Sequence, residues 1–153
     1  MSALATVDEP IGVMLVDDHA VVREGYRRLL ALETDIQVTG EFANVDEALA
    51  ALQADAVSTQ VLVMDLSMPG RDGMELLRRV RLWWPALQVL VFSMHDSPAL
   101  VLQALRTGAM GYITKSSPPQ DLVAAVRHAA QGQMVLSSDV ADALGHGCLP
   151  ARA

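Results

Sequence analysis

The chain has 153 residues, of which 52% are hydrophobic and 19% are charged, and its formal net charge is −7. This size and composition favour one folded domain over disorder, and the negative charge disfavours direct binding to a nucleic-acid backbone. A single cysteine, Cys148, excludes an internal disulfide bond and suits a reducing compartment. The first apolar run follows no basic residues, and no apolar stretch reaches membrane-spanning length. We therefore expect a soluble cytoplasmic protein with no membrane contact.

Short apolar runs, which predict strands, alternate with longer patterns of helical spacing through most of the chain. The predicted strands cover residues 11–16, 36–39, 61–64, 87–92 and 111–114. The predicted helices begin near Val22, after Asn44, at Met74, after Ser97 and at Pro119. Side-chain caps and a first-turn proline mark several of these helix starts, while Pro85, Gly108 and Gly132 mark helix ends.

The strand–helix order and the apolar character of the strands predict the fold class. Runs that are apolar on both faces indicate parallel strands buried between two layers of helices. Right-handed crossovers then give a doubly wound sheet. The prediction is an α/β, flavodoxin-like (βα)5 sheet with strand order 2-1-3-4-5, in which the alternating second strand lies at an edge.

The chain changes character after Gly132. Residues 134–136 predict a short extended piece, and Ser137 or Ser138 can cap a short helix over residues 139–144. The tail from Gly145 has no periodic pattern, so we expect it to be mobile. The expected organisation is an N-terminal extension at 1–10, a folded domain at 11–131 and a linker with a short helix and tail at 132–153.

Polar residues follow the predicted strands at the edge where a parallel sheet binds its ligands. Asp17 and Asp18 follow the first strand, Asp65 the third, Ser93 the fourth and Lys115 the fifth. Three carboxylates at one place repel one another unless a cation compensates, and hard oxygen ligands of this kind suit Mg²⁺. An aspartate beside Mg²⁺ can attack phosphorus, while an ammonium and a hydroxyl stabilise the phosphoryl oxygens. The sequence therefore predicts transfer of a phosphoryl group to an aspartate at this edge of the sheet.

This pattern resembles the response regulator receiver family of two-component systems. The resemblance lies in four segments: Val-Asp-Asp-His at 16–19, Val-Met-Asp-Leu-Ser-Met-Pro-Gly at 63–70, Phe-Ser-Met-His at 92–95 and Gly-Ala-Met-Gly-Tyr-Ile-Thr-Lys at 108–115. It covers about residues 11–131 and looks most like the NarL/FixJ (LuxR-type) subfamily, whose members usually carry a C-terminal helix-turn-helix domain.

The resemblance implies a role for each site residue. Asp65 would accept the phosphoryl group from a sensor histidine kinase, and Lys115 would contact that group. Asp18 and Asp65 would bind Mg²⁺ with the Ser67 carbonyl, and Asp17 would help through a water molecule. Ser93 and Tyr112 would form a switch pair that alters an output face made by residues 97–107 and 111–114. Homodimerisation on phosphorylation is also implied, with DNA contacted only through a C-terminal domain.

The sequence departs from the family at two places. The family usually has a proline after the lysine, joined by a cis bond, whereas Ser116 follows Lys115 here. No helix-turn-helix pattern follows Leu144, so we expect either part of a longer protein or a stand-alone receiver that acts by protein–protein contact.

Less specific interpretations stand beside these roles. Tyr112 could be a half-buried aromatic residue at a sheet edge, although the switch role is favoured. His19 and His95 are interpreted as loop or cap residues. Trp83 and Trp84 are interpreted as packing residues, of which one could be exposed. The helix over residues 99–105 is apolar on nearly every side, which suits deep burial or, as we slightly favour, a partner surface.

Two other functions use a similar site. A phosphatase of the haloacid-dehalogenase type also has a strand-end aspartate with Mg²⁺, but it needs a second aspartate two residues later, where Ser67 stands. A flavodoxin-like cofactor binder is the weaker alternative, because no phosphate-binding loop rich in Ser, Thr or Gly follows the first strand.

Overall fold

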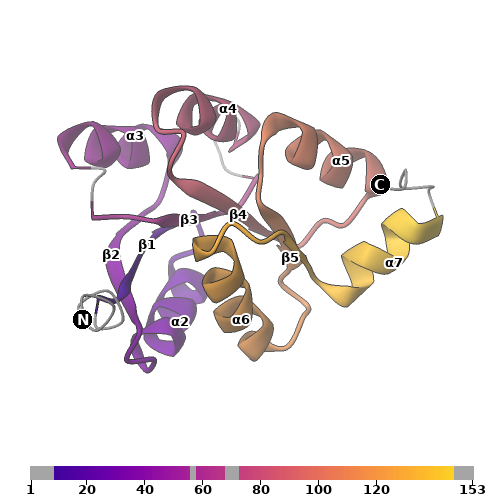
Figure 1. The fold of residues 1–153 in the computed structure, drawn as a ribbon, viewed down its shortest axis with the longest axis horizontal. Coiled ribbons are helices and arrows are strands. Elements are labelled where there is room, and N and C mark those ends of the chain that lie inside the picture. The colour runs from indigo at the N-terminus through magenta and orange to yellow at the C-terminus, as the bar shows by residue number, and fades with distance from the viewer. Residues whose placement is uncertain (1–8, 56–57, 68–72, 147–153) are drawn as a thin grey trace, which may run out of the picture.

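The fold is a parallel sheet with helices on both faces (Figure 1). The computed structural model describes residues 9–55, 58–67 and 73–146. The strands are β1 (Ile11–Val16), β2 (Ile36–Phe42), β3 (Val61–Met64), β4 (Gln88–Ser93), β5 (Gly111–Thr114) and β6 (Val135–Leu136). The helices are α2 (Ala20–Ala31), α3 (Val45–Ala54), α4 (Gly73–Trp83), α5 (Pro98–Thr107), α6 (Pro119–Ala130) and α7 (Ser138–His146).

The sheet has the order β2-β1-β3-β4-β5-β6, and all of its strand pairs are parallel. The predicted flavodoxin-like order 2-1-3-4-5 is therefore confirmed, with β2 at one edge as expected. The sixth strand was not predicted to join the sheet, because two residues carry too little pattern to distinguish a strand from an extended linker. Its pairing with β5 makes β6 the opposite edge.

The core lies on both faces of the sheet. Helices α2 and α6 cover one face, while α3, α4 and α5 cover the other (Figure 1). Alternate residues of β1 divide between two buried clusters: Val13 and Leu15 pack under α2 and α6, and Met14 and Val16 pack under the opposite layer. This division follows from the period of two in a strand, and it explains why the central strands are apolar at every position.

Several element ends differ from the predictions. Strand β2 continues to Phe42, beyond the alternating residues 36–39. Helix α7 continues through Gly145 to His146, so the helix does not stop at Leu144 as expected. The rest of the tail, 147–153, and residues 1–8 of the N-terminal extension lie outside the described residues.

The apolar helix α5 is largely packed rather than free. Val101 and Ala104 are buried, and three leucines of α5 lie partly buried against the same core cluster, namely Leu100, Leu102 and Leu105. Trp84 also packs on this cluster while Trp83 is 47% exposed, which confirms the interpretation of that pair. Within the described ranges, no helix is both long enough and apolar enough to cross a membrane.

Candidate functional site

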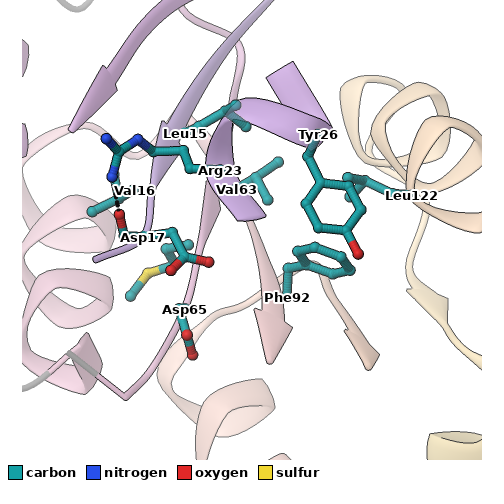
Figure 2. A pocket seen from close by; sticks show the side chains of 10 residues that line it. Leu15, Val16, Asp17, Arg23, Tyr26, Val63, Asp65, Phe92 and Leu122 are labelled. Carbon is teal, nitrogen blue, oxygen red and sulfur yellow. Dashed lines mark hydrogen bonds between the residues drawn. The ribbon is translucent and has the colours of Figure 1, made fainter. Parts of the chain in front are cut away.

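The carboxyl ends of β1, β3, β4 and β5 meet at one edge of the sheet, and their register places the site residues there. Val16 pairs with Met64, so β1 and β3 end at one level, and Met64 in turn pairs with Val91. Strands β4 and β5 continue two residues further, to the pair formed by Ser93 and Thr114. Asp17 and Asp65 come directly after β1 and β3, and both are buried. Figure 2 shows their carboxylates extending into the same region from the two neighbouring strands.

Lys115 joins the two aspartates. Its Nζ donates to Asp17 Oδ2 at 2.6 Å and to Asp65 Oδ2 at 3.0 Å, although these residues lie 98 and 50 positions away in the chain. The Lys115 side chain is only 6% exposed. Burial lowers the pKa of its ammonium, but the hydrogen bonds to Asp17 and Asp65 outweigh that effect and raise the pKa above its ordinary value. Lys115 therefore stays charged beside Asp65 at neutral pH.

The remaining contacts fix the orientation of both carboxylates. Asp65 Oδ1 accepts a hydrogen bond from the Ser67 backbone N–H at 3.1 Å. Asp17 Oδ1 accepts from the His19 backbone N–H at 2.9 Å, and the Arg23 guanidinium donates to the Asp17 carbonyl (Figure 2). With each aspartate held at both oxygens, the two face each other across the lysine. The Ser67 side chain is exposed, and residues 68–72 lie outside the described residues.

One buried carboxylate oxygen at this edge has no hydrogen-bond partner among the described residues. This atom is Asp18 Oδ1, and the nearby ring nitrogen Nδ1 of His19 lies 3.3 Å from it. Ligand atoms of Asp17, Asp18, His19 and Asp65 all lie within 4.8 Å of one another. A buried unsatisfied carboxylate oxygen costs free energy, and a hard cation would satisfy it. The acidic residues here fit a Mg²⁺ site.

His19 belongs to this group, although the sequence favoured its interpretation as a loop or cap residue. It stands at the N-cap of α2, as a cap interpretation requires, but its side chain makes no capping hydrogen bond. Instead Nδ1 lies 3.3 Å from both Asp17 Oδ1 and Asp18 Oδ1. Its place directly after the aspartate pair was the available signal.

Ser93 and Tyr112 converge on the loop that follows β4. Ser93 is fully buried, and its Oγ accepts a hydrogen bond from the His95 backbone N–H at 3.1 Å. The Tyr112 hydroxyl donates to the His95 carbonyl at 2.6 Å, and burial raises the pKa of this phenol. Tyr112 is completely buried and β5 is covered by β6, so the interpretation as a half-buried residue at a sheet edge is wrong.

The turn after β5 holds Lys115 from both sides. The Lys115 backbone N–H donates to the Ser93 carbonyl at 2.8 Å, and the Ser117 N–H closes the turn on the Thr114 carbonyl at 3.1 Å. No peptide bond is cis in the part of the chain that the structure describes, so Lys115 and Ser116 are joined in trans. The structure thus brings Asp17, Asp18, Asp65 and Lys115 together and seats Ser93 at the neighbouring strand end.

Most of the chain is similar to known proteins. Residues 13–127 match the family model described as the response regulator receiver domain. The chain is 45% identical over 137 residues to the transcriptional regulatory protein UhpA of Salmonella typhimurium, covering 90% of this chain and 67% of UhpA. It is 36% identical over 129 residues to the nitrate/nitrite response regulator NarL of Escherichia coli, covering 84% of this chain and 59% of NarL.

A solved structure of the same kind of protein has a similar fold. A two-component response regulator of the LuxR family from Aurantimonas sp. SI85-9A1 superposes with a TM-score of 0.86 at 39% identity, covering 91% of this chain and 98% of that chain. The family model matches most of the chain, and UhpA and NarL are relatives of the same kind. The chain therefore belongs to the response regulator receiver family and, by these relatives, to its NarL/FixJ subfamily.

Proposed function

We propose that Asp65 accepts a phosphoryl group from a sensor histidine kinase and that this event alters an output face formed by α5 and β5. The chain spans 67% of the length of UhpA and 59% of that of NarL. Control of a LuxR-type DNA-binding domain, with homodimerisation on phosphorylation, is therefore part of the proposal. The alternative within the same family is a receiver that acts by protein–protein contact alone.

The observation that carries the proposal is the Lys115 ammonium held between Asp17 and Asp65, at 2.6 Å and 3.0 Å. As the bond from phosphorus to an Asp65 oxygen forms and the bond to the donor nitrogen breaks, negative charge gathers on the phosphoryl oxygens. An ammonium already fixed beside Asp65 can turn to those oxygens without reorganisation of the site. The buried position of the lysine strengthens this attraction, because few water molecules screen it.

The acidic residues support the metal part of the proposal. Asp18 and Asp65 would hold Mg²⁺ with the Ser67 carbonyl, and Asp17 would assist through water. When bound, the ion neutralises charge and polarises the phosphoryl group. The His19 and Ser67 backbone amides orient the carboxylates of Asp17 and Asp65.

The switch part of the proposal uses Ser93 and Tyr112, which both bind the backbone of His95. When the Ser93 hydroxyl turns toward a phosphoryl group on Asp65, the His95 N–H loses its acceptor. The loop between β4 and α5 then loses one of the hydrogen bonds that hold it and can shift. The Tyr112 side chain shifts with the loop, because its hydroxyl is bound to the His95 carbonyl. A new dianion thus biases a loop that leads directly into α5.

The test is phosphorylation by acetyl phosphate and Mg²⁺, followed by intact mass spectrometry. We expect one added phosphoryl group on the wild-type chain and none on Asp65→Asn. The matched control is Asp35→Asn, because Asp35 pairs with Arg127 and lies next to β2 rather than at the acidic site. It should gain one group at the wild-type rate. Phosphorylation of Asp65→Asn would contradict the proposal, and multiple turnover on phosphoesters would favour the phosphatase.

A further inference from the structure

The C-terminal segment, residues 133–146, is docked on the sheet beside β5. The Val135 N–H donates to the Met110 carbonyl at 3.2 Å, and the Ser137 N–H donates to the Tyr112 carbonyl at 3.1 Å. At Gly111 a Cβ atom would lie 2.4 Å from the Val135 carbonyl oxygen, so the close approach of β6 requires glycine at this position. The segment is therefore fitted to β5.

Helix α7 continues this docking on the layer formed by α5, beside which it lies in Figure 1. Val140 is fully buried and Leu144 is 2% exposed, and both belong to the core cluster that contains Val101 and Ala104 of α5. Helix α7 thus covers part of the apolar surface of α5, for which the sequence analysis favoured contact with a partner.

Asp139 stands at the centre of a polar cluster that joins the segment to the end of β5. Its Oδ2 accepts a hydrogen bond from Thr114 Oγ1 at 2.6 Å, and its Oδ1 accepts from Ser137 Oγ at 2.7 Å and from the Val140 N–H at 3.0 Å. Ser137 Oγ in turn accepts from the Thr114 N–H at 3.2 Å. Burial raises the pKa of Asp139, but these hydrogen bonds lower it more, so the carboxyl is ionised at neutral pH.

Thr114 also contacts the turn that carries Lys115, so its hydrogen bond with Asp139 restrains that turn. Its hydroxyl oxygen lies 3.1 Å from both Ser116 Oγ and Ser117 Oγ, so one carboxylate organises three hydroxyl groups across the turn. Lys115 lies between these residues, and its ammonium lies 3.0 Å from Asp65 Oδ2. A turn that loses the Thr114–Asp139 hydrogen bond is freer to move the lysine backbone, and small misplacements of a charged group are costly in phosphoryl transfer.

We propose that Asp139 is a positioning residue: by holding Thr114 it sets the turn that carries Lys115, so that docking of the C-terminal segment and phosphorylation of Asp65 favour each other. The inference rests on the proposed function of Asp65. It assigns a role to a residue outside positions 13–127, which the family model matches. The effect is measured from two ends: on the rate of phosphorylation, which depends on the position of Lys115, and on the docking of residues 133–146 when a phosphoryl mimic is bound.

From the first end, the rate of phosphorylation by acetyl phosphate and Mg²⁺ is measured for Asp139→Asn and for Thr114→Val, which replaces the hydroxyl by a methyl group of similar size. We expect each to slow phosphorylation by about 5-fold or more, because a misplaced ammonium stabilises the transition state less well. Thr114→Ser retains the hydroxyl and should restore most of the rate. Since Asp139 acts through Thr114, the double variant should be no slower than the slower single variant.

From the second end, hydrogen exchange of residues 133–146 is followed by mass spectrometry with and without beryllofluoride and Mg²⁺, which mimic the phosphoryl group on Asp65. We expect slower exchange in this segment when the mimic binds the wild-type chain. That extra protection should be lost in Asp139→Asn and Thr114→Val. Ser138→Ala is the matched control, because the exposed Ser138 is adjacent to the cluster and takes part in none of the hydrogen bonds described above; it should behave as the wild type.

The outcomes separate this inference from the function on which it rests. A wild-type chain that takes no phosphoryl group would defeat the proposed function itself. A chain that is phosphorylated, with Asp139→Asn folded and as fast as the wild type, would overturn the positioning role alone. Faster exchange of residues 133–146 on binding the mimic would also overturn it, because the segment would then be released by phosphorylation rather than held.

Discussion

Two neighbouring residues at the end of β5 belong to clusters of opposite kind. Lys115 lies in the lysine cluster with Asp17 and Asp65, in which one ammonium pairs with two carboxylates from distant parts of the chain. Thr114 lies in the threonine cluster with Ser137 and Asp139, in which hydroxyl groups surround one carboxylate. Successive residues of a strand point to opposite faces, so a single strand end serves both clusters.

The difference between the clusters indicates what each can do. The lysine cluster places carboxylates beside an ammonium that can turn to the oxygens of an incoming phosphoryl group. This arrangement suits phosphoryl transfer. In the threonine cluster, hydrogen bonds from the chain itself satisfy the carboxylate of Asp139. This arrangement suits a structural contact between β5 and the C-terminal segment. Because the two clusters are adjacent, a change in the C-terminal segment, residues 133–146, can affect the position of Lys115 at the Asp65 site. The predictions below change the lysine cluster, then the packing and the charge of the threonine cluster, and last a position outside both.

The largest effect is expected for Lys115→Met, which removes the ammonium while keeping most of the side-chain volume. Phosphorylation of Asp65 by acetyl phosphate should slow by about 100-fold or more, as when one preorganised donor is removed from a transition state. The rate of mass gain measures it. Thermal unfolding of the same variant checks that it is folded, and a rate within about 3-fold of the wild type would remove Lys115 from the mechanism.

The next effect concerns the packing that supports the threonine cluster. Leu144→Ala deletes a buried side chain of α7, and we expect the free energy of unfolding to fall by about 2 to 4 kcal/mol. Denaturation in urea measures the change. Leu82→Ala is the matched control, because Leu82 is 73% exposed and the same substitution there should change stability by less than about 0.5 kcal/mol. Equal effects at the two positions would mean that α7 is not packed on α5 in solution.

A pH series isolates the carboxylate of Asp139. Its pKa is lowered in the folded chain from a reference of 3.8, so its stabilisation is fully present above that value and is lost as the pH falls through the folded pKa. The difference in unfolding free energy between wild type and Asp139→Asn should be about 1 kcal/mol and constant from pH 5 to pH 7. It should shrink as the pH falls below about 4. A difference that grows on acidification would contradict the ionised state of Asp139.

The smallest effect is expected far from both clusters, at the Arg127 ion pairs. Arg127 contacts Glu33 at 2.6 Å and Asp35 at 2.8 Å, but its side chain is 40% exposed and that of Asp35 is 47% exposed. Water screens such pairs, so Arg127→Gln should lower stability by less than about 1 kcal/mol, and less still at high salt. Urea denaturation at two salt concentrations measures it, and the rate of phosphorylation should not change. A changed rate would show that the two clusters are not the main determinants of the site.

The sequence predicted the fold and most of the lysine cluster for a physical reason. Short apolar runs such as Val61–Met64, alternating with helical patterns, are typical of buried parallel strands, and in a parallel sheet the residues after the strands meet at one edge. Asp65 and Lys115 therefore come together whatever the details of the loops. Their hydrogen bonds in the structure accord with that expectation.

The threonine cluster was beyond the reach of the sequence. Val135–Leu136 is too short for its periodicity to predict pairing, and without β6 the burial of Tyr112 could not be foreseen. Asp139 contacts Thr114 across 25 residues, and nothing local to either residue indicates the other. The Nδ1 contacts of His19 with Asp17 and Asp18 depend on a ring orientation that a pattern of residue types does not contain.

The assignment of Asp65 as the phosphoacceptor is tested most directly by locating the acyl phosphate in the chain. After treatment with acetyl phosphate and Mg²⁺, borohydride reduction converts a phosphorylated aspartate to homoserine, and peptide mass spectrometry finds its position. We expect homoserine at position 65 and at no other aspartate. Homoserine at position 17 or 18, or none at 65 in a chain that has gained a phosphoryl group, would contradict the proposed chemistry of this site.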